Sequence, residues 1–227
     1  MGAETFIFES YQSILEELQQ GIPVQYLTQI APFYNLELFV SPGVLIPRPE
    51  TEQLVHLVLE ENRGTHKKVL DIGTGSGCIA LALKNAWNES TITACDISEE
   101  ALEVARKNAK DLSINVDFYQ TDILTNEIAA YDILVSNPPY ISLSEKDTMH
   151  KNVIENEPHL ALFVADKDPL IFYKRIIQLA EKQRAICYFE TSEFYRTSLD
   201  SWLIESGYSF EWKDDFQGKD RILKVIW

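Results

Sequence analysis

The sequence predicts an α/β fold, in which a mostly parallel sheet is covered by helices on both faces. Three observations support this. From Lys67 onward, short apolar and β-branched runs alternate with stretches of helical periodicity. A glycine-rich loop joins the first of these strands to its helix. A later strand, 131–136, ends in Asn137-Pro138-Pro139-Tyr140, at the edge where open α/β sheets bind ligands.

Two elements are expected before the sheet. Residues 5–20 carry apolar side chains at helical spacing, which predicts an amphipathic helix whose apolar face packs on another element. Residues 21–46 are punctuated by proline and glycine, and we expect 33–34 and 36–40 to form a β-hairpin around Asn35, a linker beside the main domain. A helix is then expected over 50–61, because Pro49 suits a first helical position.

The main domain is expected over residues 47–227. Its predicted strands are 68–72, 91–95, 116–121, 131–136 and 185–190. Its predicted helices are 78–86, 99–111, 169–182 and 193–206, and residues 141–166 are expected to form a long, partly helical excursion that walls or covers the site. The stretches 208–213 and 222–227 predict a closing antiparallel hairpin with Gly218 in its loop.

Composition limits the functional classes. Lys and Arg number 20 against 35 Asp and Glu, and the net charge of −15 disfavours non-specific binding of duplex nucleic acid. No apolar run approaches the roughly 18 residues of a membrane span, and the amino end lacks a signal-peptide pattern. The cysteines are scattered and the histidines form no cluster, so we expect a reducing cytoplasmic location and no metal site.

The loop after the first strand favours a nucleoside ligand without phosphates. Gly73, Gly75 and Gly77 allow positive φ and let a ligand approach the bare backbone around Thr74 and Ser76. The dinucleotide fingerprint would need a glycine at position 78, and a P-loop would need a Gly-Lys-Ser/Thr ending; the chain has neither. The preceding Asp71 would repel a pyrophosphate but could receive an ammonium group.

Two further carboxylates follow strands. Asp96 stands 96 − 77 = 19 residues after the last loop glycine, the spacing of a carboxylate that accepts bonds from ribose hydroxyls. Asp122, with Ile123 beside it, ends the third strand, where it could meet an adenine amine. Each feature alone is common in turns and helix caps. Together, and in this order, they indicate S-adenosylmethionine, a nucleoside that carries an ammonium group and no phosphate.

The Asn137 corner suits a planar –NH2 group. The Asn137 side-chain carbonyl and the Pro138 backbone carbonyl are acceptors on a frame that two prolines stiffen. Tyr140 adds a flat face and a hydroxyl, and Pro139 completes the predicted substrate contact. A lone Asn-Pro-Pro is more often a stiffened strand exit, but the cofactor loop upstream favours the functional interpretation. Arg48, held between two prolines, is also predicted to contact the substrate.

These motifs carry a resemblance to known enzymes. Residues 68–140 resemble class I methyltransferases, whose Rossmann-like, mostly parallel sheet has seven strands and an antiparallel C-terminal strand. The Asn-Pro-Pro-Tyr ending of this stretch is similar to that of enzymes that methylate amide or exocyclic amino nitrogens. The segments 21–26 (GIPVQY) and 46–52 (IPRPETE) narrow the resemblance to the peptide chain release factor glutamine methyltransferases, the PrmC or HemK family, over about residues 20–227.

The resemblance implies an activity. A methyl group would pass from S-adenosylmethionine, leaving S-adenosylhomocysteine, to the side-chain amide nitrogen (N5) of the glutamine in the Gly-Gly-Gln motif of bacterial class I release factors. Asn137, Pro138 and Tyr140 would be catalytic. The cofactor would be bound by the glycine loop and the strand-end carboxylates together with Asn137, and no membrane or direct nucleic-acid partner is implied.

Three alternatives stay open. A methyltransferase acting on a ribosomal protein glutamine is similar, but there we expect Arg-Ser-Pro in place of Arg48-Pro49-Glu50. DNA N6-adenine methyltransferases share the Asn-Pro-Pro-Tyr ending but need a base-flipping, phosphate-binding surface that this acidic chain does not indicate. A non-catalytic S-adenosylmethionine-binding protein would have no need of an intact Asn137, Tyr140 and glycine loop.

The chain departs from the family pattern in three places. The family has an amino-terminal helical bundle, whereas 20 residues precede Gly21 here, so we expect 1–20 to be the remnant of that region. Glu190-Thr191-Ser192 stands where the family has Glu-Ile-Gly. The stretch 165–169 replaces a glycine-rich loop. We expect the last two to be local loop changes without loss of activity.

Overall fold

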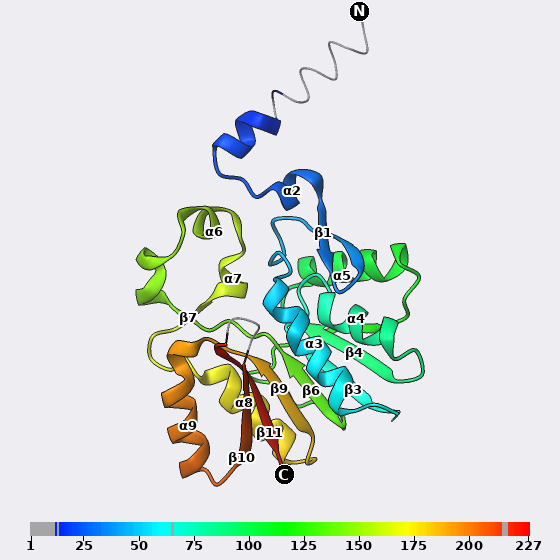
Figure 1. The fold of residues 1–227 in the computed structure, drawn as a ribbon, viewed down its shortest axis with the longest axis vertical. Helices are drawn as coiled ribbons and strands as arrows, with labels where there is room; N and C mark the ends of the chain where they lie inside the picture. Colours follow the sequence, from blue (N-terminus) through cyan, green and yellow to red (C-terminus); the bar gives the residue numbers. More distant parts are fainter. Residues whose placement is uncertain (1–11, 13, 65, 215–217) are drawn as a thin grey trace, which may run out of the picture.

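A seven-stranded sheet forms the centre of the computed structural model, which describes residues 12, 14–64, 66–214 and 218–227 (Figure 1). Its spatial order is β10-β11-β9-β6-β3-β4-β5. The strands are β3 (Lys68–Ile72), β4 (Thr91–Asp96), β5 (Asp117–Gln120), β6 (Ile133–Ser136), β9 (Ile186–Glu190), β10 (Ser209–Asp214) and β11 (Asp220–Ile226). Every neighbouring pair from β9 to β5 is parallel, and β11 is antiparallel to both β9 and β10. The predicted mostly parallel sheet with a reversed C-terminal strand is therefore confirmed.

Helices cover both faces of this sheet (Figure 1). The helices α3 (Pro49–Glu61), α4 (Cys78–Ala86) and α5 (Glu99–Asp111) lie over one face, and α8 (Ile171–Glu181) and α9 (Arg196–Glu205) lie over the other. Alternate residues of β3 follow this division: Val69 packs in the cluster with α3 and α4, whereas Leu70 and Ile72 pack in the cluster with α8 and α9. A strand buried on both faces is expected to be mostly apolar, and the exception in β3 is the buried carboxylate Asp71.

The chain order reverses at β3. This strand has β4 on one side and β6 on the other, so the loops that follow β3, β4 and β6 leave the same edge of the sheet close together. Open α/β sheets bind ligands at such a switch point. The glycine loop, Asp96 and Asn137 all follow these three strands.

The linker forms a short helix and a hairpin. The hairpin, β1 (Ile30–Phe33) and β2 (Leu36–Phe39), was predicted; the helix α2 (Val24–Thr28) was not. Tyr34 and Asn35 have φ of 45° and 63°, as two-residue hairpin turns that match the strand twist require. The first strand begins three residues earlier than predicted, because Pro32 in a two-stranded hairpin need not interrupt pairing.

The hairpin is built into the core rather than resting beside it. Phe33 and Leu38 are 1% and 0% exposed and belong to the same cluster as α3 and α4. The buried Asn108 joins α5 to the hairpin: its Oδ1 accepts from the Phe39 N–H at 2.7 Å, and its Nδ2 donates to the Phe39 carbonyl at 2.9 Å. This anchored hairpin fixes the course of residues 40–48 toward the site.

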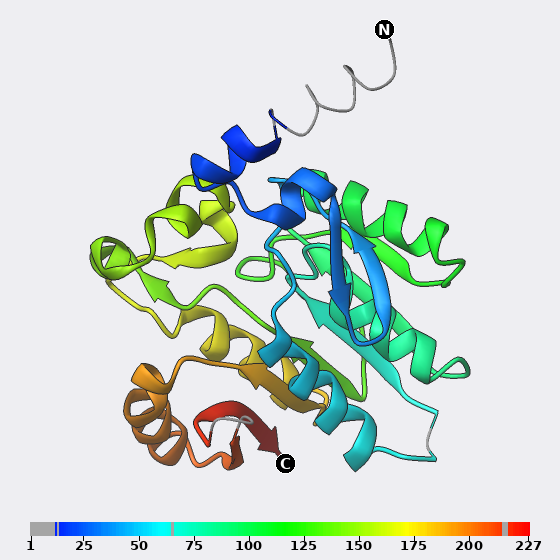
Figure 2. The ribbon, with the colours of Figure 1, turned by 45° about the horizontal axis from the view of Figure 1, so that its top comes forward.

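The excursion after the Asn137 corner is partly helical, as predicted. It contains β7 (Ile141–Ser142), the 3-10 helix η1 (Leu143–Thr148), α6 (Lys151–Asn156), α7 (His159–Leu162) and β8 (Phe163–Val164). Figure 2 shows it beside the helical residues 14–19, and Nδ2 of Asn156 donates to the Gly21 carbonyl at 3.3 Å. A second 3-10 helix, η2 (Glu193–Tyr195), precedes α9. Together η2 and α9 replace the single helix predicted over 193–206, and the other predicted elements match the observed ones to within two residues at each end.

The predicted helix over residues 5–20 is only partly described. Residues 14–19 are helical, and residues 5–11 and 13 lie outside the described residues. Ile14, Leu15 and Leu18 are 40%, 55% and 39% exposed, so these three side chains lack the packing that we expected for the apolar face.

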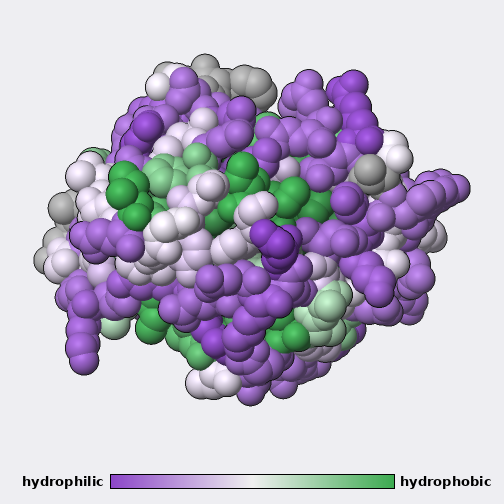
Figure 3. Space-filling model, turned by 90° about the horizontal axis from the view of Figure 1, so that it is seen from below, coloured by the Kyte–Doolittle hydropathy of each residue, from purple (hydrophilic) through white to green (hydrophobic). Residues whose placement is uncertain are grey.

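Hydrophilic side chains dominate the face of the molecule shown in Figure 3, with small apolar areas between them. This agrees with the strongly acidic composition. Within the described ranges, no helix combines the length and the apolar character needed to cross a bilayer.

Candidate functional site

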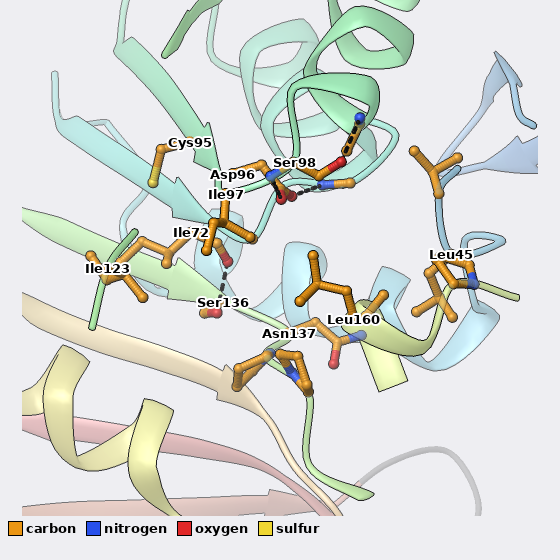
Figure 4. Close-up of a pocket in the computed structure, with 18 of the residues that line it drawn as sticks. Leu45, Ile72, Cys95, Asp96, Ile97, Ser98, Ile123, Ser136, Asn137 and Leu160 are labelled. Atoms are coloured by element: carbon orange, nitrogen blue, oxygen red, sulfur yellow. Dashed lines mark hydrogen bonds between the residues drawn. The ribbon is translucent and has the colours of Figure 1, made fainter. Parts of the chain in front are cut away.

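Two cavities share a wall at the Asn137 corner. The larger, of about 560 Å³, lies at the switch point and is drawn in Figure 4. The smaller, of about 200 Å³, lies between the start of α3 and the excursion. Both are lined by Leu45, Asn137, Pro138 and Ala161. A ligand in either cavity would therefore contact the same corner.

The glycine loop exposes its backbone to the larger cavity at two positions. Gly73 and Gly75 line that cavity with φ of 72° and 55°, and a Cβ added at either would meet nothing within 4 Å. Gly77 has a different task. A Cβ there would lie 3.2 Å from Cβ of Ala105, so this glycine lets the loop pack against α5.

Asp71 lies behind the loop and holds its shape. The side chain is fully buried, and Oδ2 accepts from the Thr74 hydroxyl at 2.6 Å and from the Ala80 N–H at 3.2 Å. Oδ1 has no hydrogen-bond partner among the described residues. Burial raises the pKa of Asp71 to about 7. Since Asp71, Thr74, Ser76 and Gly77 are absent from the lining of both cavities, their direct contact with a cofactor stays a prediction.

Asp96 connects the second strand to the glycine loop. Its Oδ2 accepts from the Gly75 N–H at 2.9 Å, and its Oδ1 accepts from the Ser98 N–H at 3.0 Å. Burial raises the pKa of Asp96, and the backbone N–H groups of Ser98, Gly75 and Ile97 oppose that rise. Asp96 lines the larger cavity (Figure 4). Each carboxylate oxygen can accept a second bond, so both stay available to a ligand hydroxyl.

Asp122 and Ile123 also line the larger cavity, and their predicted contact with the cofactor stays a prediction. Asp122 caps a turn at the same time, because Oδ1 accepts from the Leu124 N–H at 2.9 Å and Oδ2 from the Thr125 hydroxyl at 3.1 Å. Ile123 is buried, and with Ile97 it supplies apolar wall.

The end of β6 presents Asn137 in a fixed orientation. The Ser136 hydroxyl donates to the Ile72 carbonyl at 2.7 Å and holds the strand end against β3 (Figure 4). Nδ2 of Asn137 donates to Oγ1 of Thr51 at 3.2 Å, and that hydroxyl donates to Oε2 of Glu190 at 2.5 Å. The Asn137 amide nitrogen is thus occupied by protein, which leaves Oδ1 for a ligand.

The other predicted substrate residues divide between the cavities. Tyr140 and Arg48 line the smaller one, and Pro139 lines the larger. Burial, and secondarily the charge of Glu190, raises the pKa of Tyr140 to about 12, so the phenol keeps its proton at neutral pH. Nη2 of Arg48 donates to both carboxylate oxygens of Glu157, and its predicted contact with a substrate stays a prediction.

The chain has close relatives of known family. Residues 50–161 match the family model described as a methyltransferase small domain. A protein of Bacteroides thetaiotaomicron named release factor glutamine methyltransferase is 43% identical over 219 residues, which cover 93% of this chain and 78% of the relative. A protein of the same name from Flavobacterium psychrophilum is 40% identical, covering 95% and 79%. This chain belongs to the release factor glutamine methyltransferase family.

Solved structures share the fold of this family member. The human Mettl16 catalytic domain in complex with a MAT2A 3′UTR hairpin superposes with a TM-score of 0.67 at 19% identity, covering 86% of this chain and 76% of that one. A ribosomal protein L11 methylase from Lactobacillus delbrueckii subsp. bulgaricus gives 0.56 at 22% identity, covering 83% of each chain. Together with the family model, they confirm the predicted class I methyltransferase fold.

Sequence reasoning did not assign Thr51 or Glu190 to the site of this glutamine methyltransferase family member. Both contribute to the hydrogen-bond chain at Asn137, and Glu190 lines the smaller cavity. Glu190 ends β9, the strand beside β6, so the rule that ligand-binding residues follow parallel strands could have found it. Thr51 carried no comparable signal, because its distance to Asn137 depends on how α3 packs. Residues 42–45 also line the larger cavity and were not predicted to do so. Residues 158–161 line it too, and they belong to the excursion that was expected to wall or cover the site.

Proposed function

We propose that this chain transfers a methyl group from S-adenosylmethionine to the side-chain amide nitrogen (N5) of the glutamine in the Gly-Gly-Gln motif of bacterial class I release factors. Family membership supports this proposal. The structural observation that carries it is the orientation of Asn137, whose Nδ2 is engaged by Thr51 and whose Oδ1 remains available in the wall shared by two cavities.

The larger cavity suits S-adenosylmethionine. Its volume of about 560 Å³ falls in the range of about 300–1,000 Å³ typical of small-molecule sites. Gly73 and Gly75 offer bare backbone, Asp96 offers acceptors for ribose hydroxyls, and Ile97 and Ile123 offer apolar surface to a flat base. When bound, S-adenosylmethionine supplies a methyl carbon activated by a positively charged sulfur.

The smaller cavity suits a side-chain carboxamide. Its volume of about 200 Å³ is too small for S-adenosylmethionine. The cavity is lined by Asn137, Pro138 and Tyr140. We assign one substrate N–H to Oδ1 of Asn137 and the other to the Pro138 carbonyl. Tyr140, uncharged at neutral pH, would pack against the amide plane.

These acceptors would orient the substrate instead of deprotonating it. An amide nitrogen is a poor nucleophile, because its lone pair is delocalised into the carbonyl. Holding it in a reactive orientation can contribute on the order of 7–11 kcal/mol in favourable cases. The same two oxygens would stabilise positive charge that develops on the nitrogen, an electrostatic effect specific to the transition state. Proton loss to solvent would follow the transfer.

Domain roles follow from this assignment. We propose that residues 47–227 are the methyltransferase domain, that 21–46 are the linker, and that 1–20 belong to an amino-terminal helical region. The linker also contributes wall to the cofactor cavity through residues 42–45. Because the proposed substrate is a translation factor, we place the reaction in the cytoplasm.

A labelling experiment tests the function. The protein would be incubated with methyl-labelled S-adenosylmethionine and a release factor, and with the same factor carrying Glu in place of the Gly-Gly-Gln glutamine. A ribosomal protein fraction and adenine-containing DNA would serve as alternative acceptors. We expect label only in the native release factor, located to that glutamine by mass spectrometry. Label confined to an alternative acceptor, or cofactor binding without any transfer, would overturn the proposal.

A further inference from the structure

We propose that Thr51 and Glu190 are positioning residues that determine which end of the Asn137 side-chain amide faces the substrate. The inference rests on the proposed function, because it explains how the acceptor used there is kept in place. It concerns residues that would act through Asn137 rather than at the reacting atoms.

Three elements bring these side chains together. Thr51 lies in the first turn of α3, Asn137 follows β6, and Glu190 ends β9. β6 and β9 pair in parallel with Ser136 opposite Phe189, so Asn137 and Glu190 are the next residues on adjacent strands. Thr51 and Glu190 are only 2% and 3% exposed, which excludes bulk water as a competing partner.

The direction of the hydrogen bonds follows from what each group can do. The ionised Glu190 carboxylate only accepts, so beside it the Thr51 hydroxyl donates its single hydrogen to Glu190. Asn137 therefore meets acceptors on this side, the lone pairs of Thr51 Oγ1 and the Glu190 side chain, and only its –NH2 end can donate to them. Oδ1 must therefore face away from Thr51.

The opposite orientation would oppose the reaction. If the amide were rotated by half a turn, Oδ1 would meet the lone pairs of Thr51 Oγ1, and the Asn137 –NH2 would face the –NH2 of the substrate carboxamide. The first contact would set acceptor against acceptor, and the second would set donor against donor. Both buried contacts would then lack hydrogen bonds.

Other groups hold Glu190 itself in place. The Tyr173 hydroxyl donates to the Glu190 backbone carbonyl at 3.2 Å, so the main chain is fixed independently of the carboxylate. The positive charge of Arg221 on β11 acts on the carboxylate, as does the negative charge of Glu50 on α3. A substitution of the Thr51 hydroxyl changes none of these interactions, which makes it the cleaner test.

The test compares two variants of Thr51 in the full chain. Thr51→Val keeps the shape and removes the hydroxyl, and Thr51→Ser keeps the hydroxyl. We expect the single-turnover methylation rate of the release factor to fall about 10–100-fold in Thr51→Val, the size of effect that a misaligned reactant produces. Thr51→Ser should recover most of the rate, with the Kd of S-adenosylmethionine within about 2-fold in both. Equal losses in the two variants, or no loss in Thr51→Val, would overturn the positioning role.

A second readout does not depend on the substrate. Hydrogen exchange of the Asn137 side-chain –NH2, assigned by its disappearance in Asn137→Ala, can be followed by ¹⁵N NMR. We expect exchange to be about 10-fold faster in Thr51→Val than in the native chain or Thr51→Ser, because exchange reports loss of the hydrogen bond. If Thr51→Val does not fold, Thr51→Ala takes its place, and the same loss of rate and protection is expected, because it also removes the hydroxyl.

The two readouts separate two failures. If the native chain leaves the release factor unmethylated while –NH2 protection depends on the Thr51 hydroxyl, the proposed function fails and the positioning stands. If methylation proceeds and protection is the same in Thr51→Val, the positioning fails and the proposed function stands.

Discussion

Nη2 of Arg48 lies 2.6 Å from Oε1 and 2.7 Å from Oε2 of Glu157, a residue 109 positions further along the chain. The Glu157 side chain is 2% exposed, and the Arg48 side chain is 34% exposed. This pair joins the residue before α3 to the excursion, directly before Pro158, which lines the larger cavity. The wall of the site is therefore held by a charge-assisted contact between distant segments.

Breaking this pair should destabilise the fold. Arg48→Ala would leave the buried Glu157 carboxylate without its partner, and we expect the free energy of unfolding to fall by about 2–3 kcal/mol. Urea unfolding measures this change. The double variant Arg48→Met/Glu157→Gln should recover part of the loss, since no buried charge remains. Native stability in Arg48→Ala would show that the pair contributes nothing.

Asp96 should determine cofactor affinity. Asp96→Ala removes the proposed ribose acceptors and two hydrogen bonds to backbone N–H groups. We expect the Kd of S-adenosylmethionine to rise about 10–100-fold, which corresponds to the free energy of one or two hydrogen bonds to a charged group. Calorimetric titration measures the Kd, and circular dichroism should show an unchanged fold. An unaltered Kd would remove Asp96 from the ribose assignment.

Two loop glycines should respond differently to the same substitution. Gly75→Ala places a methyl group where the structure has open space, so we expect weaker binding of S-adenosylmethionine and a stability loss of about 1–2 kcal/mol from its positive φ. Gly77→Ala drives its Cβ toward Ala105 and should lower the melting temperature further. A larger melting-temperature loss in Gly75→Ala would contradict the packing role of Gly77.

The Glu190 carboxyl should make stability depend on pH. Burial raises its pKa from 4.5 to about 7, against the opposing effects of Thr51, Arg221 and Asn137, while Glu50 adds to the rise. Between these two pH values the folded chain holds a proton that the unfolded chain has released. The free energy of unfolding should therefore decrease as the pH rises from about 4.5 to about 7.

Glu190→Gln provides the comparison for this pH dependence. The variant cannot titrate at this position, so its curve of unfolding free energy against pH should fall less steeply than the native curve. Asp71, whose pKa burial also raises to about 7, contributes equally to both curves and cancels in their difference. Parallel curves would mean that Glu190 titrates normally.

Local patterns were sufficient to predict the sheet and its helices. The strand 133–136 and the helix 99–111 follow from apolar periodicity, because a buried strand and a one-sided helix impose different spacings on the sequence. The cavity lining of Gly73, Asp96 and Asn137 was predictable for a related reason: parallel strands bring the residues after them to one edge.

Contacts between residues far apart in the chain could not be predicted from such local patterns. The substrate contact predicted for Arg48 stays a prediction, and no local pattern indicated its ion-pair partner Glu157, which lies on an excursion whose path depends on tertiary contacts. Thr51 is 86 residues from Asn137 in the chain, and no spacing rule relates them. The short helix α2 was missed, since five residues carry too little periodic signal.

The effect of Asn137→Ala on single-turnover methylation, measured beside the Kd of S-adenosylmethionine, tests the central claim most directly. Loss of the Oδ1 acceptor should slow transfer to the release factor glutamine at least about 10²–10³-fold, while the Kd changes by no more than about 3-fold. A rate near the native value, or a loss of cofactor binding as large as the loss of rate, would contradict the role assigned to this side chain.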